Sequence, residues 1–312
     1  MQRRNLLRTA AIAGGAATLT AGGMALAESG SGNDEDGSPT FVFVSGSNGT
    51  NVTFNGLGLN GLRSVAAELP GHGTGHFPVE YQAPQDLESG ARQESPLKDI
   101  GLDDYVAAAV ETVRTVAEFG PVILIGMSMG GAVVSRVGNE VPDLVDHMVY
   151  DTAICCVDLP SIAEYFATPE GSTSLAGTLA DWAVGDPEET GASRTNWRSS
   201  DPGFIAAAKE ALFGDGTDEE LLSMMATLQP DESASVVVED ASGKKDTWGT
   251  IPRTYIRHTL DNMIPIALQD RFIAEADALT PDNRFAVHTV ETSHVGTKEA
   301  HDKVLKILID LA

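Results

Sequence analysis

The 312-residue chain predicts an α/β fold, in which a mostly parallel sheet is flanked by helices and carries an inserted helical cap. Two observations predict it. Short β-branched runs alternate with helical patterns, which is typical of parallel strands joined by crossover helices. Residues 158–246 break this alternation with helix-like pieces joined by Gly, Pro and Asp, and are the expected cap. The core would then comprise residues 40–157 and 247–312.

Each element of this core is expected from its residue pattern. Runs rich in β-branched and aromatic residues predict strands over 40–44, 63–67, 121–125, 144–150, 253–257 and 284–290. Helical periodicity predicts helices over 102–119, 129–139, 266–278 and 297–311 in the core, and over 161–166, 174–183, 203–212 and 218–228 in the cap. With 42% hydrophobic residues, the chain is long enough for one large domain with an insertion.

Residues 1–27 predict a signal peptide of the twin-arginine type. Arg3 and Arg4 precede a mildly apolar Ala, Gly and Thr run that ends at Ala27. Glycines and threonines make this run too polar for a good membrane span of about 20 residues. We therefore expect a secreted or periplasmic protein with no membrane anchor after signal cleavage, and a flexible acidic leader over 28–39.

The chain is strongly acidic, with 45 Asp and Glu against 20 Lys and Arg and a formal net charge of −25. Loss of Arg3, Arg4 and Arg8 with the signal peptide would give −28. Such a charge repels nucleic acid and anionic membrane surfaces, so neither is an expected partner. A solubilising surface and an adaptation to high salt both fit it, and the oligomeric state stays open.

The pattern Gly126-Met127-Ser128-Met129-Gly130 has the G-x-S-x-G form of a nucleophile elbow. An expected strand precedes it and an expected helix follows it, which is the context that the motif requires. The glycines allow a tight strand-to-helix turn, and the N-terminus of the helix directs N–H groups and a positive dipole at a developing oxyanion. Ser128 is therefore the candidate nucleophile.

A serine hydroxyl needs a histidine base that is itself oriented by a carboxylate. His294 follows the last expected strand in a loop before the last helix and is the candidate base, with His258 as a second candidate. Asp261 lies in the loop after an expected strand and is the candidate acid. Asp151, at the end of the preceding strand, is its rival. The chain order serine, aspartate, histidine is the order expected for such a fold.

The oxyanion hole needs two backbone N–H donors. We expect one from Met129, after the nucleophile, and one from Ser47 in the glycine-rich loop Ser45-Gly46-Ser47-Asn48-Gly49. Phosphate binding by this loop is disfavoured, because no lysine and no dinucleotide-binding pattern follows.

Two further segments receive structural interpretations. The loop with His72 and His76 is interpreted as a chain reversal. Cys155 and Cys156 are adjacent, so a disulfide between them would be strained and we expect buried thiols. Two sulfurs without nearby ligands cannot complete a metal site.

These residues resemble the α/β-hydrolase superfamily, and more narrowly the small esterase and hydroxynitrile lyase-like group that holds plant methyl esterases. The resemblance runs from about residue 40 to the C-terminus and is strong over 41–49, 69–73, 122–131, 255–265 and 291–294. It implies a triad of Ser128, Asp261 and His294 and oxyanion donors at Ser47 and Met129.

Two departures from the group matter. Its members commonly have His-Gly where this chain has Ser45-Gly46. Its hydroxynitrile lyases carry a threonine at the position of Gly46 and rely on a cap lysine, so Gly46 favours ester hydrolysis.

The expected function is that of a secreted serine esterase, with a small or medium apolar ester or lactone as substrate and partner, and no metal or organic cofactor. Two alternatives stay open. One is a C–C or C–CN lyase or a cyclase on the same scaffold, and the other is a non-catalytic binding protein.

Overall fold

The computed structural model describes residues 37–50, 53–73, 78–82 and 84–312. The expected signal peptide, most of the expected acidic leader and His76 lie outside this part. Core and cap segments belong to one unit, Gly37–Ala312. Within the described part, no helix is both long and apolar enough to cross a membrane.

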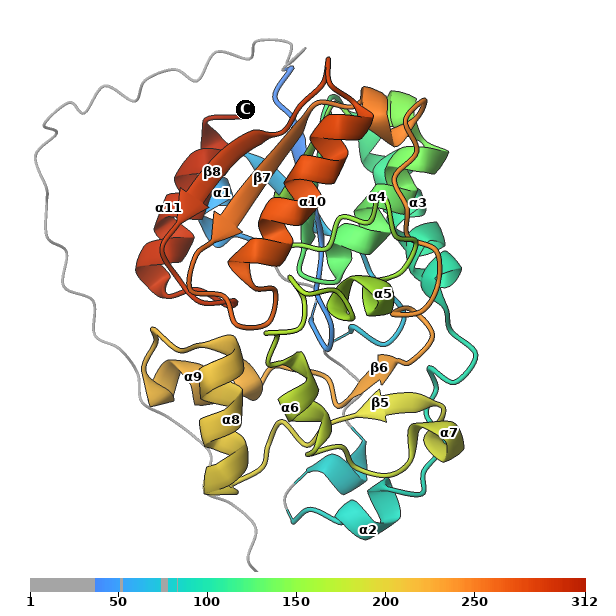
Figure 1. Cartoon of the computed structure of the whole chain (residues 1–312), viewed down its shortest axis with the longest axis vertical. Coiled ribbons are helices and arrows are strands. Elements are labelled where there is room, and N and C mark those ends of the chain that lie inside the picture. The colour runs from blue at the N-terminus through green and yellow to red at the C-terminus, as the bar shows by residue number, and fades with distance from the viewer. Residues whose placement is uncertain (1–36, 51–52, 74–77, 83) are drawn as a thin grey trace, which may run out of the picture. The chain divides into compact units, whose positions relative to one another are not determined.

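A six-stranded parallel sheet forms the centre of this unit (Figure 1). Its order is β2-β1-β3-β4-β7-β8, with β1 (Thr40–Val44), β2 (Arg63–Ala66), β3 (Val122–Met127), β4 (His147–Asp151), β7 (Arg253–His258) and β8 (Ala286–Val290). Every neighbouring pair is parallel. The carboxyl ends of the strands therefore meet at one edge, and the loops that follow them can converge there.

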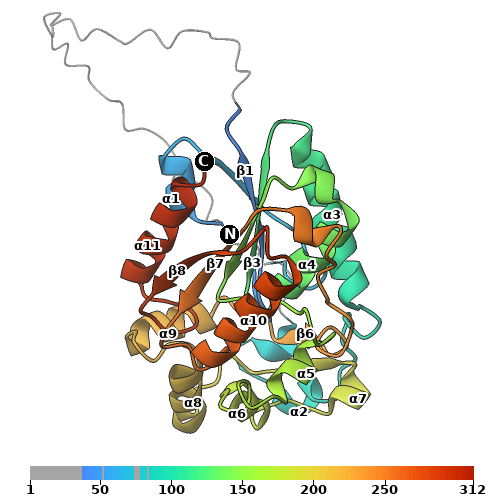
Figure 2. The same cartoon turned by 45° about the horizontal axis from the view of Figure 1, so that its top comes forward.

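Helices cover both faces of the sheet, and alternate residues of the central strands pack on opposite sides. One core joins Val42, Leu124 and Tyr150 to α3 (Leu102–Ala117), α4 (Gly130–Glu140) and α10 (Ile266–Leu279). The opposite core joins Phe43 and Ile125 to α1 (Asn55–Leu59) and α11 (Lys298–Ile309). Figure 2 shows α1 and α11 together on one side, away from α3 and α4. Burial on both faces explains why the central strands are nearly continuous apolar runs.

The expected cap segment contains more than helices. It holds α5 (Ile162–Phe166), α6 (Ala176–Ala180), α7 (Pro187–Thr190), α8 (Pro202–Leu212) and α9 (Asp218–Met225), together with an antiparallel pair, β5 (Ala192–Arg194) and β6 (Asp231–Ser233). These strands were not predicted, because each has only three residues. A buried ion pair between Arg194 and Asp231 links them. The α6, α8 and α9 helices share a separate apolar cluster that includes Phe204 and Leu221.

Short elements account for the remaining differences from expectation. The strand expected over 144–150 begins only at His147, because Pro142–Leu144 forms a 3-10 turn. Further short helices are α2 (Leu87–Gly90), Val79–Tyr81 and Trp248–Thr250.

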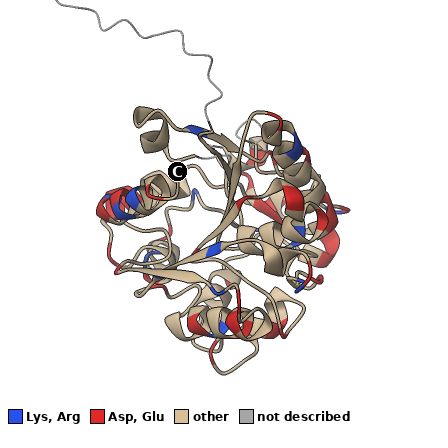
Figure 3. Ribbon diagram, turned by 90° about the horizontal axis from the view of Figure 1, so that it is seen from above, with Lys and Arg blue, Asp and Glu red and all other residues tan. Residues whose placement is uncertain are grey.

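Figure 3 shows Asp and Glu spread over the helices that surround the sheet.

Both cysteines are buried and free, as expected. Burial raises the pKa of the Cys155 thiol to about 12, so it carries no thiolate near neutral pH.

Candidate active site

Ser128 occupies a strained turn between β3 and α4. Its φ of 51° lies in the left-handed region, which costs a non-glycine residue about 1–3 kcal/mol. The Ser128 carbonyl accepts the Ile154 N–H at 2.9 Å, which helps to hold the turn. A Cβ at Gly130 would lie 2.4 Å from the Val44 carbonyl oxygen, so only glycine lets α4 start this close to β1. The predicted elbow conformation is therefore present.

The structure brings the three predicted triad residues together. His294, in the loop between β8 and α11, places Nε2 3.0 Å from Ser128 Oγ. Its Nδ1 lies 2.7 Å from Oδ2 of Asp261, which is in the loop between β7 and α10. Both distances are within the hydrogen-bond reach that proton transfer requires. The three side chains come from loops at the same edge of the sheet, as parallel strands require.

Asp261 is held by groups beyond His294. Its Oδ1 accepts the N–H groups of Met263 at 2.7 Å and Ile264 at 2.8 Å. Thr152 Oγ1 donates to Oδ2 at 2.5 Å. Burial alone would raise the pKa of Asp261, but His294, Thr152 and the Ile264 N–H outweigh it and lower the pKa. Thr152 was not predicted as part of the site. A left-handed turn after β4, with φ 38° at Thr152, places it here.

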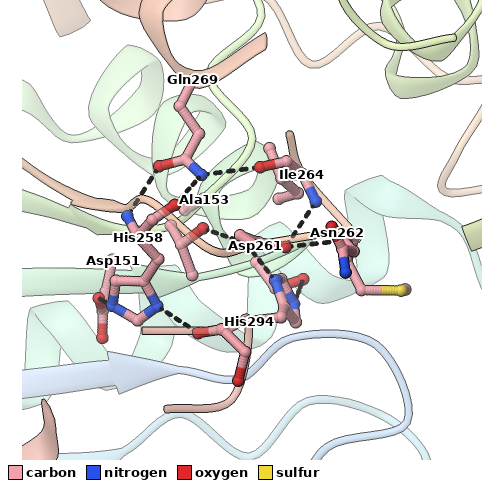
Figure 4. A network of polar contacts seen from close by, with 12 residues as sticks. Asp151, Ala153, His258, Asp261, Asn262, Ile264, Gln269 and His294 are labelled. Atoms are coloured by element: carbon pink, nitrogen blue, oxygen red, sulfur yellow. Dashed lines mark hydrogen bonds and ion pairs between the residues drawn. The ribbon is translucent and has the colours of Figure 1, made fainter. Parts of the chain in front are cut away.

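The rival residues Asp151 and His258 form a separate pair (Figure 4). Asp151 Oδ1 lies 3.1 Å from His258 Nε2, which is close enough for an ion pair. The two groups are not aligned for a hydrogen bond. His258 Nδ1 donates to the Ser293 carbonyl at 3.0 Å. Burial lowers the pKa of His258, but Asp151, Asp261 and the Ser293 carbonyl together outweigh it, so that the net pKa is raised. Asp151 thus pairs with His258, whereas His294 pairs with Asp261.

The predicted oxyanion residues lie against the nucleophile. A Cβ at Gly46 would be 2.8 Å from Ser128 Cβ, which shows how closely this loop approaches. Ser47 Oγ lies 3.1 Å from Met129 Sδ. Across the described residues, the backbone N–H groups of Ser47 and Met129 have no hydrogen-bond partner. Both groups are therefore available to a bound oxygen.

An apolar pocket of about 150 Å³ opens beside Ser128. Ser47 and Met129 line it together with Ile154, Ile162, Phe166, Ala176, Val237, Met263 and Ile264. None of these side chains is charged. Among the described residues, no group of three or more His, Cys, Asp and Glu is arranged to hold a metal ion.

The sequence did not predict the side-chain contacts of two residues near the site, His72 and Asp215. His72 does lie in a chain reversal, with its N–H on the Leu69 carbonyl at 3.0 Å, but its side chain is fully buried and its Nδ1 lies 2.8 Å from Ser45 Oγ. Asp215 of the cap accepts hydrogen bonds from the hydroxyl of Thr292 at 2.6 Å and from the hydroxyl of Ser293. These bonds fix the loop that carries His294. The segment 69–73 carries part of the resemblance but gives no sign of the partner of His72, and Asp215 belongs to no motif; the partners of both residues lie far away in the chain.

Comparison with known proteins places these features in context. A protein phosphatase methylesterase 1 of Neurospora crassa is 29% identical over 187 residues, which cover 51% of this chain and 40% of that protein. The chain therefore matches less than half the length of this relative.

Solved structures share the fold over most of the chain at low sequence identity. A pyrethroid hydrolase from Sphingobium faniae has a TM-score of 0.65 at 18% identity, covering 88% of this chain and 96% of that one. A polyneuridine aldehyde esterase variant has a TM-score of 0.63 at 18% identity, covering 88% and 99%. An extracellular alpha/beta-hydrolase from a Paenibacillus species has a TM-score of 0.61 at 17% identity, covering 87% and 98%.

The family comparison agrees with the fold. Residues 41–307 match the alpha/beta hydrolase family, which confirms the predicted fold class and the resemblance seen in the sequence. The chain belongs to the alpha/beta hydrolase family.

Proposed function

We propose that this protein is a serine hydrolase that cleaves carboxylic esters by acyl transfer through Ser128, His294 and Asp261. The observation that carries the proposal is the continuous line of contacts from Ser128 Oγ through both nitrogens of His294 to Asp261 Oδ2. Its esterase relatives and its family support hydrolysis of an ester.

In this mechanism Ser128 Oγ attacks the ester carbonyl carbon while His294 Nε2 takes the hydroxyl proton. Asp261 orients the imidazole and stabilises the imidazolium. The oxyanion accepts hydrogen bonds from the N–H groups of Ser47 and Met129. When the tetrahedral intermediate collapses, the C–O bond to the leaving alcohol breaks and His294 returns its proton to that oxygen.

Deacylation repeats these steps with water. His294 removes a proton from water, whose oxygen attacks the acyl carbon, and the second tetrahedral intermediate expels Ser128 with the proton returned to Oγ. A free acid leaves. A lactone would react in the same way, except that the alcohol stays attached to the acyl chain.

The pocket supports a neutral, apolar substrate. Its lining offers no charged side chain to balance a charge on the part of the substrate that it encloses. Two features favour hydrolysis over the lyase alternative. The hydroxynitrile lyases of the group rely on a cap lysine, and no lysine lines this pocket. They also carry a threonine where this chain has Gly46, which places no side chain beside Ser128.

Release of a chromophore from p-nitrophenyl esters tests the function. A burst equal to the enzyme concentration would show the acyl-enzyme. A fluorophosphonate should label Ser128 alone, and Ser128→Ala should abolish both burst and labelling while the melting temperature stays close to that of the parent. Full activity in Ser128→Ala would contradict the assignment, and a folded protein that neither hydrolyses nor reacts would favour the binding-protein alternative.

We also propose that the protein is exported. The support is the Arg3-Arg4 pair near the start of the expected signal peptide, the mildly apolar run that follows and its small-residue end at Ala27. Replacement of both arginines by lysine should retain the precursor inside the cell, and N-terminal sequencing of the exported form should begin near Glu28.

A further inference from the structure

Glu232, in the short cap strand β6, is a buried carboxylate surrounded by four donors. Its Oε2 accepts the Asn48 N–H at 2.6 Å and faces His72 Nε2 at 3.1 Å. Its Oε1 accepts the Tyr105 hydroxyl at 2.6 Å and the N–H of Ser233 at 3.0 Å. These donors come from the loop of residues 45–49, called the oxyanion loop below, from the chain reversal after β2, from helix α3 and from β6 itself. Residues far apart in the chain therefore converge on one side chain.

Only an ionised carboxylate suits this environment. It accepts at about four lone-pair positions and donates at none, which matches the four donors. A buried charge is costly unless it is hydrogen-bonded and paired. Burial alone would raise the pKa of Glu232, but His72, Tyr105 and the Asn48 N–H outweigh it and lower the pKa. The carboxylate is therefore ionised near neutral pH.

These contacts fix the oxyanion loop at both ends. On one side of Ser47, Ser45 Oγ bonds to His72 Nδ1, and His72 in turn faces Glu232. On the other side, Asn48 has a left-handed φ of 55°, a conformation that asparagine adopts more readily than other non-glycine residues. Its N–H is held by Glu232, and its carbonyl accepts the Gln229 N–H at 2.8 Å. Ser47 thus lies between two points that the cap anchors.

We propose that Glu232 is a positioning residue that sets the direction of the Ser47 N–H toward the oxyanion, so that the cap completes the oxyanion hole. The inference rests on the proposed ester hydrolysis by Ser128. It gives the cap a second role in addition to lining the pocket, because a cap carboxylate holds the backbone of the loop at Asn48.

The effect should appear in kcat rather than in KM. An oxyanion donor gains its full hydrogen bond only when charge develops on the carbonyl oxygen, so a misdirected donor affects the transition state more than substrate binding. Loss of one donor costs about 10²–10³ in kcat, and a displaced donor should cost less.

The test compares neighbouring carboxylates of β6. Glu232→Gln keeps the size but places an NH₂ group against two donors. We expect kcat to fall by about 10- to 100-fold with KM within about threefold. The matched control is Asp231→Asn. The Asp231 carboxylate pairs with Arg194, with Oδ1 2.5 Å from Nε, and not with the oxyanion loop. This variant should lower the melting temperature while kcat per labelled active site stays within about twofold.

A transition-state readout separates positioning from general damage. An arylboronic acid forms a tetrahedral serine adduct whose oxygen occupies the oxyanion hole, so its inhibition constant should rise in proportion to the loss of kcat in Glu232→Gln. If that variant does not fold, Ser45→Ala removes the hydroxyl link to His72 without stranding a buried charge. It should lower kcat by about 3- to 10-fold and lower the melting temperature moderately, because His72 Nδ1 loses its buried partner.

The outcomes are distinguishable. Unchanged kcat in Glu232→Gln, or in Ser45→Ala where Glu232→Gln does not fold, would overturn the positioning role while leaving ester hydrolysis intact. An equal loss of kcat in Asp231→Asn would also overturn it, because any lost β6 carboxylate would then have the same effect. A parent protein that forms no acyl-enzyme would refute the proposed function itself, before any variant is compared.

Discussion

Asp151 and His258 form a second buried acid–histidine pair beside the candidate triad, with Asp151 Oδ1 3.1 Å from His258 Nε2. His258 Nδ1 donates to the carbonyl of Ser293, which immediately precedes His294. Two aspartate–histidine pairs therefore lie side by side, and only one of them reaches Ser128. Their different positions predict different consequences of mutation.

Substitution of the two acids should separate their roles. Asp261→Asn should lower kcat by roughly 10⁴-fold, as in the best-studied triad, because the amide favours the wrong histidine tautomer. Asp151→Asn should change kcat by about tenfold or less and act mainly on stability. Single-turnover acylation rates measure both effects. A larger loss in Asp151→Asn than in Asp261→Asn would transfer the catalytic acid to β4.

The pair also predicts a pH dependence of stability. The pKa of His258 is raised in the folded protein, by Asp151 and more weakly by Asp261. Its stabilising contribution is therefore fully present below the unfolded pKa of about 6.5 and is lost as pH rises through the folded pKa. The difference in melting temperature between the parent and Asp151→Asn should be largest near pH 6 and should shrink toward pH 9. A constant difference across this range would show that His258 is not charged in the folded state.

The close approach of the oxyanion loop to the nucleophile predicts intolerance of any side chain at Gly46. Gly46→Ala would place a Cβ 2.8 Å from Ser128 Cβ, so the loop or the serine must shift. We expect kcat to fall by about 10²-fold or more. Gly58→Ala is the matched control, since it has open space at its Cβ and lies in helix α1. Its activity should equal that of the parent, with stability unchanged or raised by up to about 1 kcal/mol.

The volume of the pocket predicts a limit on substrate size. A dry apolar cavity of about 150 Å³ can hold benzene, and the pocket beside Ser128 has about this volume. In a series of esters with one fixed group, kcat/KM should rise until the enclosed group has about six carbons and then fall. A steady rise through long chains would show that the bound substrate extends outside this pocket. Ile162→Ala should move the maximum toward larger groups.

The acidic composition predicts a dependence on salt. At about 0.01 M salt the screening length is roughly 30 Å, so charges on opposite faces repel one another, and at about 1 M it falls to roughly 3 Å. With a net charge of −25, the melting temperature should climb between low and moderate NaCl. A continued increase above about 1 M would indicate adaptation to high salt. A melting temperature unchanged across the series would limit the acidic excess to a role in solubility.

The sequence by itself determined the sheet, its main helices and the candidate triad. Local patterns were sufficient there, because β-branched runs specify buried strands and the glycines around Ser128 specify a tight elbow. Asp261 and His294 could be selected because parallel strands bring the loops after β7 and β8 to one edge. For this reason a position after a strand was enough to predict proximity.

Only the tertiary structure decided how these parts are held. Glu232 meets Asn48, 184 residues away in the chain, and Asp215 meets Ser293, 78 residues away. The sequence favoured Asp261 over Asp151, but which histidine each carboxylate contacts depends on a few ångströms that only the tertiary structure shows. A buried carboxylate finds its donors through packing of the whole chain, and no local periodicity records that arrangement.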